Sequence, residues 1–360
     1  MSGLCAACRV GIAIVKGDGI GPELVESAIE ILNAATAFDG PTLDFETVSG
    51  GADTFSRTGE AMSAETLERL RTEYAAIMKG PVGLPEVRHK GGTEGGLLGG
   101  VLRIGLDTFA NVRPIRLLQG VNTPVRHQAG DIDFVIVREN TEGLYLSRGV
   151  GVRTAHAASD QLMVTRHGCE RISRYGFELA RKRRGAPKDG ARRVTCVDKS
   201  NVLTSYAFFR AIFDEVAAEY PDIEADYRYA DAAAHDLVAD PGHFDVIVTE
   251  NFLGDLLSDL GAATVGGLGM CGSANIGLGV SYFEPIHGSA PAIAGKHLAN
   301  PTSQVLCAAM MLDHLGYVEV AGRIVRAVET SYAHGEIALN SLGQPREGTL
   351  AATKTIISHL

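Results

Sequence analysis

The stretch VGIAIVKGDGIGPELVESAIEIL, residues 10–32, has the pattern of a strand, a turn and a helix in succession. The run Val10 to Val15 is apolar and β-branched, which is typical of a buried strand. The turn GDGIG follows, and Pro22 precedes the amphipathic stretch Leu24 to Leu32, as expected of a helix with proline in its first turn.

The same pattern returns four times along the chain. Short apolar runs at 75–78, 134–137, 193–197 and 244–248 precede the polar segments GPVG, RENTEG, DKSN and TENFLGD. Alternating short strands and helices predict an α/β architecture with much parallel sheet. Because ligands of such sheets bind beyond the carboxyl ends of the strands, we expect these polar segments to converge on one cleft.

Composition excludes several classes of protein. The chain has 360 residues, of which 45% are hydrophobic, enough for about two domains and too apolar for a disordered protein. Its net charge of −10, without a basic block, argues against a nucleic-acid surface. The 43 glycines gather in clusters such as GGTEGGLLGG, which is typical of loops that approach a small ligand closely.

The cysteines favour a reducing compartment. Cys169, Cys196, Cys271 and Cys307 stand alone, so we expect buried thiols rather than disulfides, and a cytoplasmic protein. Cys5 and Cys8 form a CAAC segment that fits either a metal or redox pair or an irregular N-terminus, and the latter is favoured because no second pair follows. No secretory signal pattern opens the chain.

One uncharged segment is long enough to span a bilayer. It covers residues 260–283, but its seven glycines and several polar residues favour a buried helix and loop.

The turn GDGIGP is not a dinucleotide fingerprint. The pattern G-x-G-x-x-G requires glycine at position 22, where Pro22 stands, so a Rossmann fold is not expected. Alone, the segment predicts only a strand-to-helix turn.

Paired carboxylates in TENFLGDLLSDL, residues 249–260, point to a metal. Asp255 and Asp259 are spaced i, i+4 and share one face of a predicted helix. A solvated acidic face is the alternative, but the surrounding apolar residues and glycines favour a bound cation. Oxygen ligands suit Mg²⁺ or Mn²⁺, and Asp231 in YADAAAHDLV offers a third oxygen.

Cationic and phenolic side chains complete a candidate site. Arg103, Arg113 and Arg138 recur where strands and loops are expected to end, which suits a substrate with two or three carboxylates, although each alone fits a surface ion pair. Lys199 follows an apolar strand, where partial desolvation suits a general base, with a surface lysine as the alternative. Tyr145 in ENTEGLY is ambiguous alone.

Six motifs together resemble a known family. KGDGIGP, FANVRP, VRENTEGLY, VDKSNVL, VTENFLGDLLSDL and FEPIHGSAPAIAGKHLANP occur in the order found in β-decarboxylating dehydrogenases acting on isocitrate, homoisocitrate, 3-isopropylmalate and tartrate or D-malate. The resemblance covers about residues 10–350. It implies a two-domain α/β fold, 1–112 with 263–360 and 113–262, with a largely parallel sheet in the first domain. It also implies a homodimer whose active sites lie at the domain and subunit boundary.

The resemblance assigns roles by position. Arg103, Arg113 and Arg138 match the family's substrate-carboxylate arginines, and Asn201 of the VDKSNVL motif is expected to bind the substrate as well. Tyr145 matches the catalytic tyrosine and Lys199 the base. The metal ligands are Asp231, Asp255 and Asp259. In that family, Lys199 and Asp231 act in the partner subunit's site.

The expected nucleotide loop departs from the family pattern. The residues matching it are Glu284, His287, Gly288, Ser289, Ala290, Ala292, Ile293 and Asn300. NAD-using relatives carry aspartate where Ala292 stands, and NADP-using relatives usually carry lysine and tyrosine where Ala292 and Ile293 stand. The lysine that would pair with the 2′-phosphate of NADP is absent, so we expect NAD. The aspartate typical of NAD-using relatives is absent too, so NADP stays an alternative.

The expected substrate-specificity segment departs as well. The positions are counted back from Arg103. Isocitrate enzymes have serine six and asparagine four positions before this arginine, whereas isopropylmalate enzymes have leucines four and three positions before it. Here Leu97, Gly99 and Gly100 occupy these positions. Two glycines predict an open pocket for a larger or anionic C3 substituent, such as a phosphonate.

The predicted activity is therefore oxidative decarboxylation of an isocitrate-like 3-substituted malate, with NAD and Mg²⁺ or Mn²⁺. The alternatives are a 3-isopropylmalate or tartrate/D-malate dehydrogenase, a non-catalytic regulatory subunit, and a phosphate-binding module built on GDGIG. The VRENTEGLY motif favours the isocitrate and homoisocitrate branch.

Overall fold

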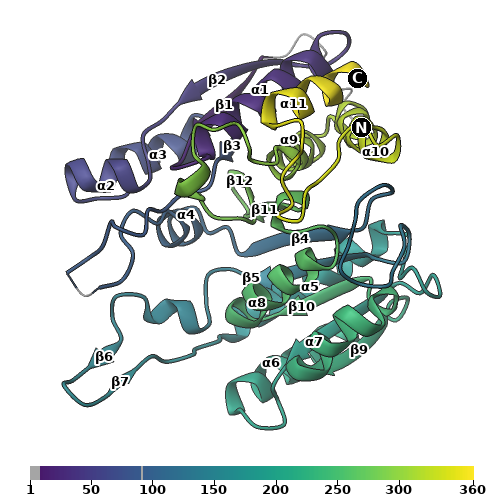
Figure 1. Ribbon diagram of the computed structural model, residues 1–360. Helices are drawn as coiled ribbons and strands as arrows, with labels where there is room; N and C mark the ends of the chain where they lie inside the picture. The colour runs from purple at the N-terminus through teal and green to yellow at the C-terminus, as the bar shows by residue number, and fades with distance from the viewer. Residues whose placement is uncertain (1–8, 91) are drawn as a thin grey trace. The chain divides into compact units, whose positions relative to one another are not determined.

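The computed structural model describes residues 9–90 and 92–360 and divides the chain into two compact units (Figure 1). Unit 1 comprises Met1–Thr108, Leu118–Asn122 and Gly266–Leu360, and unit 2 comprises Phe109–Leu117 and Thr123–Val265. As a division into domains, 1–112 with 263–360 and 113–262 stays a prediction. The Cys5 and Cys8 pair lies outside the described residues.

The described residues of unit 1 form five strands in the order β2-β1-β3-β12-β11, all parallel to their neighbours except β11, which runs antiparallel to β12. The strands are β1 (Arg9–Val15), β2 (Thr42–Thr47), β3 (Ala76–Lys79), β11 (Gly272–Ile276) and β12 (Ser281–Pro285). The helices are α1 (Gly21–Thr36), α2 (Ala52–Thr58), α3 (Ala64–Thr72), α4 (Gly99–Gly105), η3 (Leu268–Met270), η4 (Pro291–Ile293), α9 (Thr302–His314), α10 (Val318–Ala333) and α11 (Thr349–Ser358).

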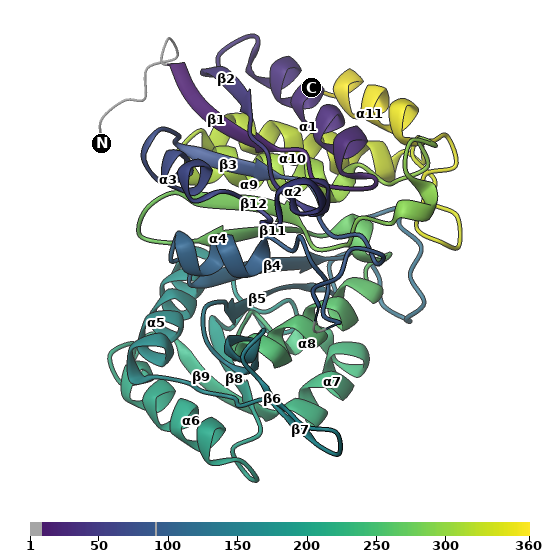
Figure 2. The same cartoon turned by 90° about the vertical axis from the view of Figure 1, so that its left-hand side faces the viewer.

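Both ends of the chain build unit 1. The N-terminal helix α1 packs against α9, α10 and α11 from the C-terminal part, so purple and yellow segments lie side by side in Figure 2. Residues 12–15 of β1 and all of β3 are buried, as expected of strands covered on both faces. One core cluster joins Ala13, Ile77 and Tyr282 from the sheet with Leu98 and Leu102.

Unit 2 contains the strand order β4-β5-β10-β8-β9, parallel throughout except between β4 and β5. These strands are β4 (Ala110–Arg116), β5 (Asp133–Glu139), β8 (Arg193–Asp198), β9 (Glu224–Tyr229) and β10 (Val246–Thr249), and β6 (Val152–Arg153) pairs with β7 (Ala158–Ser159) in a separate hairpin. The helices are η1 (Leu144–Ser147), α5 (Arg166–Lys182), α6 (Thr204–Ala217), α7 (Ala230–Ala239), η2 (Pro241–His243) and α8 (Asn251–Ala263). Figure 2 shows α5 and α6 on one side of these strands and α7 and α8 on the other.

The glycine turn after β1 is a strand-to-helix connection, as predicted. Gly19 has φ +58°, and a Cβ atom there would lie 2.0 Å from the carbonyl oxygen of Ser289. The amide of Ile20 donates to the same carbonyl over 2.8 Å. The turn thus packs directly on the 284–300 segment, and only glycine permits this approach.

The uncharged segment 260–283 contains the end of α8, η3, β11 and the start of β12, so strands stand where a loop was expected. Among the described residues no helix has the length and hydropathy to cross a bilayer. The expectation about the cysteines is confirmed. In the described part of the chain, Cys169, Cys196, Cys271 and Cys307 are buried thiols rather than disulfides.

Candidate active site

Two buried arginines lie on one face of the unit 2 sheet. The antiparallel register places Asn111 of β4 opposite Arg138 of β5, so Arg113, two residues further along β4, faces the same side. The side chains of Arg113 and Arg138 are 6% and 1% exposed. Such buried guanidinium groups require acceptors, which come from helix α8 and from Asn111 of β4.

Helix α8 carries the predicted carboxylate pair. Arg138 Nη1 forms an ion pair with Asp255 Oδ1, while Arg113 lies 3.6 Å from Asp255 Oδ1 and 3.5 Å from Asp259 Oδ1. Arg113 thus lies near both carboxylates and offsets their mutual repulsion. Partial burial raises the pKa of Asp259. Arg113 lowers this pKa and the charge of Asp255 raises it, and the net shift is upward.

Tyr145 joins this cluster from η1. Its hydroxyl donates to Asp255 Oδ2 over 2.7 Å, and its ring centroid lies 5.7 Å from Cζ of Arg138. Asp255 therefore contacts the phenol through Oδ2 and the two guanidinium groups through Oδ1.

Three polar residues that the sequence analysis did not single out hold the arginines. Asn251 Oδ1 accepts bonds of 2.9 and 2.7 Å from Nε and Nη2 of Arg138. Asn111 Oδ1 and Ser258 Oγ each accept a 2.6 Å bond from Arg113. Ser258 and Asn251 lie within one helical turn of Asp255, a spacing that could have identified them.

Lys199 and Asp231 form a separate pair. Lys199 follows β8 and Asp231 lies in the first turn of α7, and Nζ is 2.5 Å from Oδ1. The hydrogen bond from Lys199 lowers the pKa of Asp231. Asn201, two residues after Lys199, is exposed.

Within one chain, Asp231 lies apart from the other two predicted metal ligands, and its role as a ligand stays a prediction. Within the described residues, Asp231, Asp255 and Asp259 do not bring three carboxylate oxygens within 4.8 Å of one another. The reason is that α7 directs Asp231 to Lys199, with the side chain of Asp231 73% exposed.

The substrate-specificity segment lies in unit 1. Arg103 lies inside helix α4, not at the end of a strand or loop as predicted, because the helix runs from Gly99 to Gly105. A Cβ atom at Gly99 would lie 3.6 Å from both Nε and Cζ of Arg103. Gly99 and Gly100 are half-buried, as is Leu97. A Cβ atom at position 99 would therefore be in ordinary van der Waals contact with the Arg103 guanidinium.

The predicted nucleotide loop begins on β12 with a buried ion pair. Glu284 Oε2 lies 2.6 Å from Nζ of Lys79, whose side chain is 2% exposed, and Glu284 Oε1 accepts a 3.0 Å bond from Asn275. Sequence pattern did not identify Lys79, the last residue of β3, or Asn275 on β11, because neither belongs to a recognisable motif.

The loop continues with a strained turn. Ala290 has φ +39° and precedes η4, in which Ala292 is exposed and Ile293 half-buried. Nζ of Lys296 donates to the Ala292 carbonyl over 2.9 Å, so a cation lies beside position 292. Gly288 is exposed.

The other predicted loop residues differ in their surroundings. Desolvation lowers the pKa of His287. Ser289 is buried and donates to the Gly83 carbonyl. Asn300 accepts from the Thr302 amide at the start of α9, so its side chain also has a structural role.

Asp18, in the glycine turn, is a buried residue that the sequence analysis left unassigned. Its Oδ2 accepts from the amides of Ala52 and Gly83 over 2.9 and 2.8 Å, and its Oδ1 from Asp53 over 3.4 Å. The carboxylate thus ties the turn to the start of α2 and to the segment after β3.

Comparisons with known proteins agree with this architecture. Residues 11–359 match the family model described as isocitrate/isopropylmalate dehydrogenase. The 3-isopropylmalate dehydrogenase of Corynebacterium efficiens is 45% identical over 329 residues, covering 89% of this chain and 93% of the relative. That of Clavibacter michiganensis subsp. michiganensis is 41% identical, with 96% and 98% covered.

Solved structures agree as well. The isocitrate dehydrogenase of Methylococcus capsulatus superposes with a TM-score of 0.85 at 36% identity, covering 97% of this chain and 99% of that one. The TT0538 protein of Thermus thermophilus gives a TM-score of 0.85 at 39% identity, with 98% and 68% covered.

Proposed function

Because the chain belongs to the isocitrate/isopropylmalate dehydrogenase family, we propose that it oxidises and decarboxylates a 3-substituted malate with a nicotinamide cofactor. The cluster of Arg113, Arg138, Tyr145, Asp255 and Asp259 carries this proposal. A regulatory subunit without turnover is disfavoured because this set of arginines, tyrosine and carboxylates is intact.

A divalent cation fits the carboxylates of α8. Asp255 and Asp259 are oxygen donors on one helical face, partly shielded from water, and such donors suit Mg²⁺ or Mn²⁺. Asp255 and Asp259 would hold the ion together with Asp231 of the partner subunit. When bound, the cation polarises the oxygen at C2 and stabilises negative charge there.

Protein side chains bind the substrate and transfer protons in the proposed reaction. Arg113 and Arg138, with Arg103, bind the substrate carboxylates, since guanidinium binds a carboxylate in a fork. Lys199 of the partner subunit would take the proton of the 2-hydroxyl, and a bound nicotinamide would accept the hydride from C2. The carboxylate at C3 leaves as CO₂, and Tyr145 donates a proton to C3, which gives a 2-oxo acid.

We propose a homodimer with shared sites, and the pairing of Asp231 supports it. Lys199 and Asp231 form their own pair, apart from the Asp255 cluster within one chain. Two copies related by a two-fold axis can each supply this pair to the other.

The identity of the C3 substituent has two candidates. The relatives at 45% and 41% identity are named 3-isopropylmalate dehydrogenases, which favours an isopropyl group over the isocitrate-like substituent expected from the motifs. The second candidate is a bulkier or anionic group, as in isocitrate, which the space at Gly99 beside Arg103 favours.

A substrate panel separates these candidates. We expect the highest kcat/KM for 3-isopropylmalate among isopropylmalate, isocitrate, homoisocitrate, D-malate and a phosphonate analogue, each with NAD and NADP. The change Gly99→Leu should raise the ratio of isopropylmalate to isocitrate turnover, since it adds an apolar wall beside Arg103. Preference for isocitrate would select the second candidate, and absence of turnover with every substrate would favour the regulatory subunit.

For the cofactor, we propose NAD bound along Glu284, His287, Gly288, Ser289, Ala290, Ala292, Ile293 and Asn300. The uncharged side chains of Ala292 and Ile293 support NAD, while Lys296 beside Ala292 is a cation that NADP could use.

A further inference from the structure

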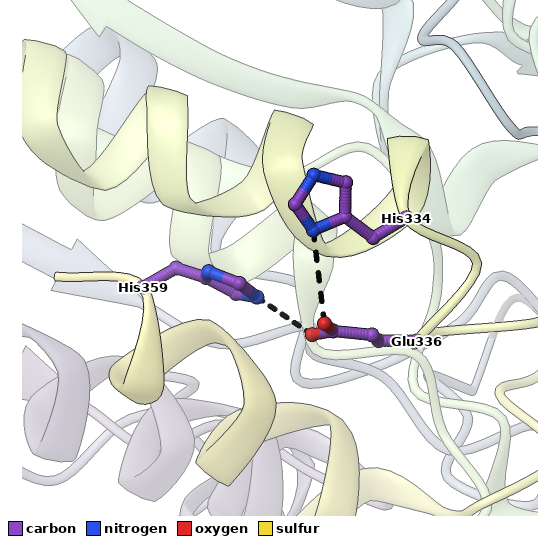
Figure 3. Close-up of side chains that lie close together, drawn as sticks. All are labelled: His334, Glu336 and His359. Atoms are coloured by element: carbon purple, nitrogen blue, oxygen red, sulfur yellow. Dashed lines mark hydrogen bonds and ion pairs between the residues drawn. The ribbon is translucent and has the colours of Figure 1, made fainter.

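A second group of possible metal ligands lies at the C-terminal end of unit 1. In the part of the chain that the structure describes, His334, Glu336 and His359 form the one group of three or more His, Cys, Asp or Glu residues whose ligand atoms all lie within 4.8 Å of one another. His359 Nε2 is 2.6 Å from Glu336 Oε2, and His334 Nδ1 is 3.7 Å from Glu336 Oε1 (Figure 3). Both imidazoles thus face one carboxylate.

The end of α10 holds two of these residues in place. Gly335, with φ +70°, follows the helix, and the amides of Gly335 and Glu336 donate to the carbonyls of Tyr332 and Ser331. This is the Schellman arrangement, which reverses the chain after a helix. It places His334 and Glu336, two positions apart, on the same side, while Ile337 beside them in the sequence is buried.

The end of α11 supplies the third residue. Helix α11 packs against α10 and α1, and His359 is its C-terminal cap. His334 is likewise the C-terminal cap of α10, and the two imidazole centroids are 5.8 Å apart. Two helix C-termini with their partial negative charges therefore meet at the cluster, which favours a cation there.

We propose that His334, Glu336 and His359 bind one divalent cation of the zinc type, at a site separate from the proposed catalytic carboxylates. Two imidazole nitrogens and one carboxylate oxygen are ligands that Zn²⁺ prefers, whereas Mg²⁺ prefers oxygen alone. The proposal does not depend on the proposed function, because none of its residues belongs to the cluster of unit 2.

The geometry needs little adjustment to hold the ion. Ligand atoms of a tetrahedral zinc site lie roughly 3.4 Å apart, given bonds of about 2.1 Å. The side chains of His334 and Glu336 are 60% and 43% exposed, so both are able to turn the short remaining distance, and the exposed side leaves room for water as a fourth ligand.

The test is zinc binding to the full chain, measured by titration calorimetry. Two competing sites are first suppressed: Cys5→Ser with Cys8→Ser removes the thiols, and excess Mg²⁺ fills the carboxylates of α8. We expect one Zn²⁺ per chain. Removing a residue that only hydrogen-bonds to a metal ligand typically lowers metal affinity roughly tenfold or more. Loss of a ligand itself should cost at least as much. We therefore expect zinc affinity to fall at least about tenfold in each of three variants: His334→Ala, Glu336→Gln and His359→Ala.

Matched measurements keep the result interpretable. His156→Ala, which alters an exposed histidine of unit 2, should leave zinc affinity unchanged. Thermal unfolding without zinc shows whether each variant is folded, and Zn²⁺ should raise the Tm of the parent protein but not of the three ligand variants. The proposal is overturned if folded ligand variants bind zinc as the parent and His156→Ala do, or if the parent binds no zinc.

Discussion

Tyr145 and Asp255, which are 110 positions apart in the sequence, share a hydrogen bond of 2.7 Å between the phenol and Oδ2. The proposed proton donor and a proposed metal ligand are therefore in direct contact. Arg138 reinforces the arrangement, because it pairs with the same carboxylate and lies near the tyrosine ring. A change at either residue should consequently affect both proton transfer and metal binding, but to different degrees.

Tyr145→Phe removes the hydroxyl and keeps the ring. We expect kcat to fall by roughly 10²- to 10⁴-fold, the range attributable to a general acid, while hydride transfer survives. A stopped-flow experiment should show a burst of reduced nicotinamide near one equivalent per site, followed by slow release of the 2-oxo acid. Equal loss of the burst and of steady turnover would show that the phenol is needed for oxidation instead.

Asp255→Asn should weaken Mn²⁺ binding and turnover together, since an amide oxygen is a poorer ligand than a carboxylate. We expect at least about a tenfold loss of Mn²⁺ affinity, measured by the EPR signal of the free ion. Asp53→Asn, at an exposed helical aspartate paired with Arg57, serves as the control and should change neither quantity.

Acidification should weaken Mn²⁺ binding in the parent protein too. The pKa of Asp259 is raised, so its carboxylate takes up a proton at a pH above the ordinary aspartate value of about 3.9 as the pH falls.

Activity that persists in the presence of a strong chelator would contradict the metal assignment.

Subunit mixing tests the shared site. Lys199→Met and Asp255→Asn should each be inactive alone. If Lys199 serves the partner's site, a mixed dimer has one intact site and one with both lesions, so equal random mixing should restore about one quarter of the parent activity. If both residues serve the same chain, every site in the mixture carries a lesion and no activity returns.

Ala292→Asp tests the nucleotide loop. A carboxylate there would accept from the ribose hydroxyls and repel a 2′-phosphate, so the NAD to NADP ratio of kcat/KM should rise roughly tenfold for about 1.5 kcal/mol gained. Lys296→Met is the companion variant, because Lys296 bonds the Ala292 carbonyl. A selective loss of NADP use in Lys296→Met would identify this lysine as a phosphate contact, and unchanged ratios in both variants would place the ribose elsewhere.

Much of the fold and part of the candidate site follow from local sequence pattern. The runs 75–78, 134–137, 193–197 and 244–248 correspond to β3, β5, β8 and β10, because buried parallel strands are continuous apolar stretches with polar residues after them. The spacing of Asp255 and Asp259 likewise predicts their common face on α8, since helical geometry alone determines it.

The rest depends on packing between distant segments. Asn251 is a partner of Arg138 only because α8 crosses β5, and Asp231 turns to Lys199 because α7 follows β9 beside β8. His359 reaches Glu336 only because α11 packs on α10. None of these neighbours is set by periodicity, so sequence pattern identifies the residues without showing which of them meet.

The hydrogen bonds around Asp18 also decide what the glycine turn does. A loop that cradles a phosphate must present several unoccupied backbone amides to the anion. Here the amides of Asp18, Ile20 and Gly21 already donate to the carbonyls of Pro81, Ser289 and Asp18. A buried carboxylate stands in the middle of the turn, and its negative charge would repel an approaching phosphate. The turn therefore connects β1 with α1 and fixes neighbouring segments of unit 1 to one another. It resembles an anion-binding loop only in its glycines.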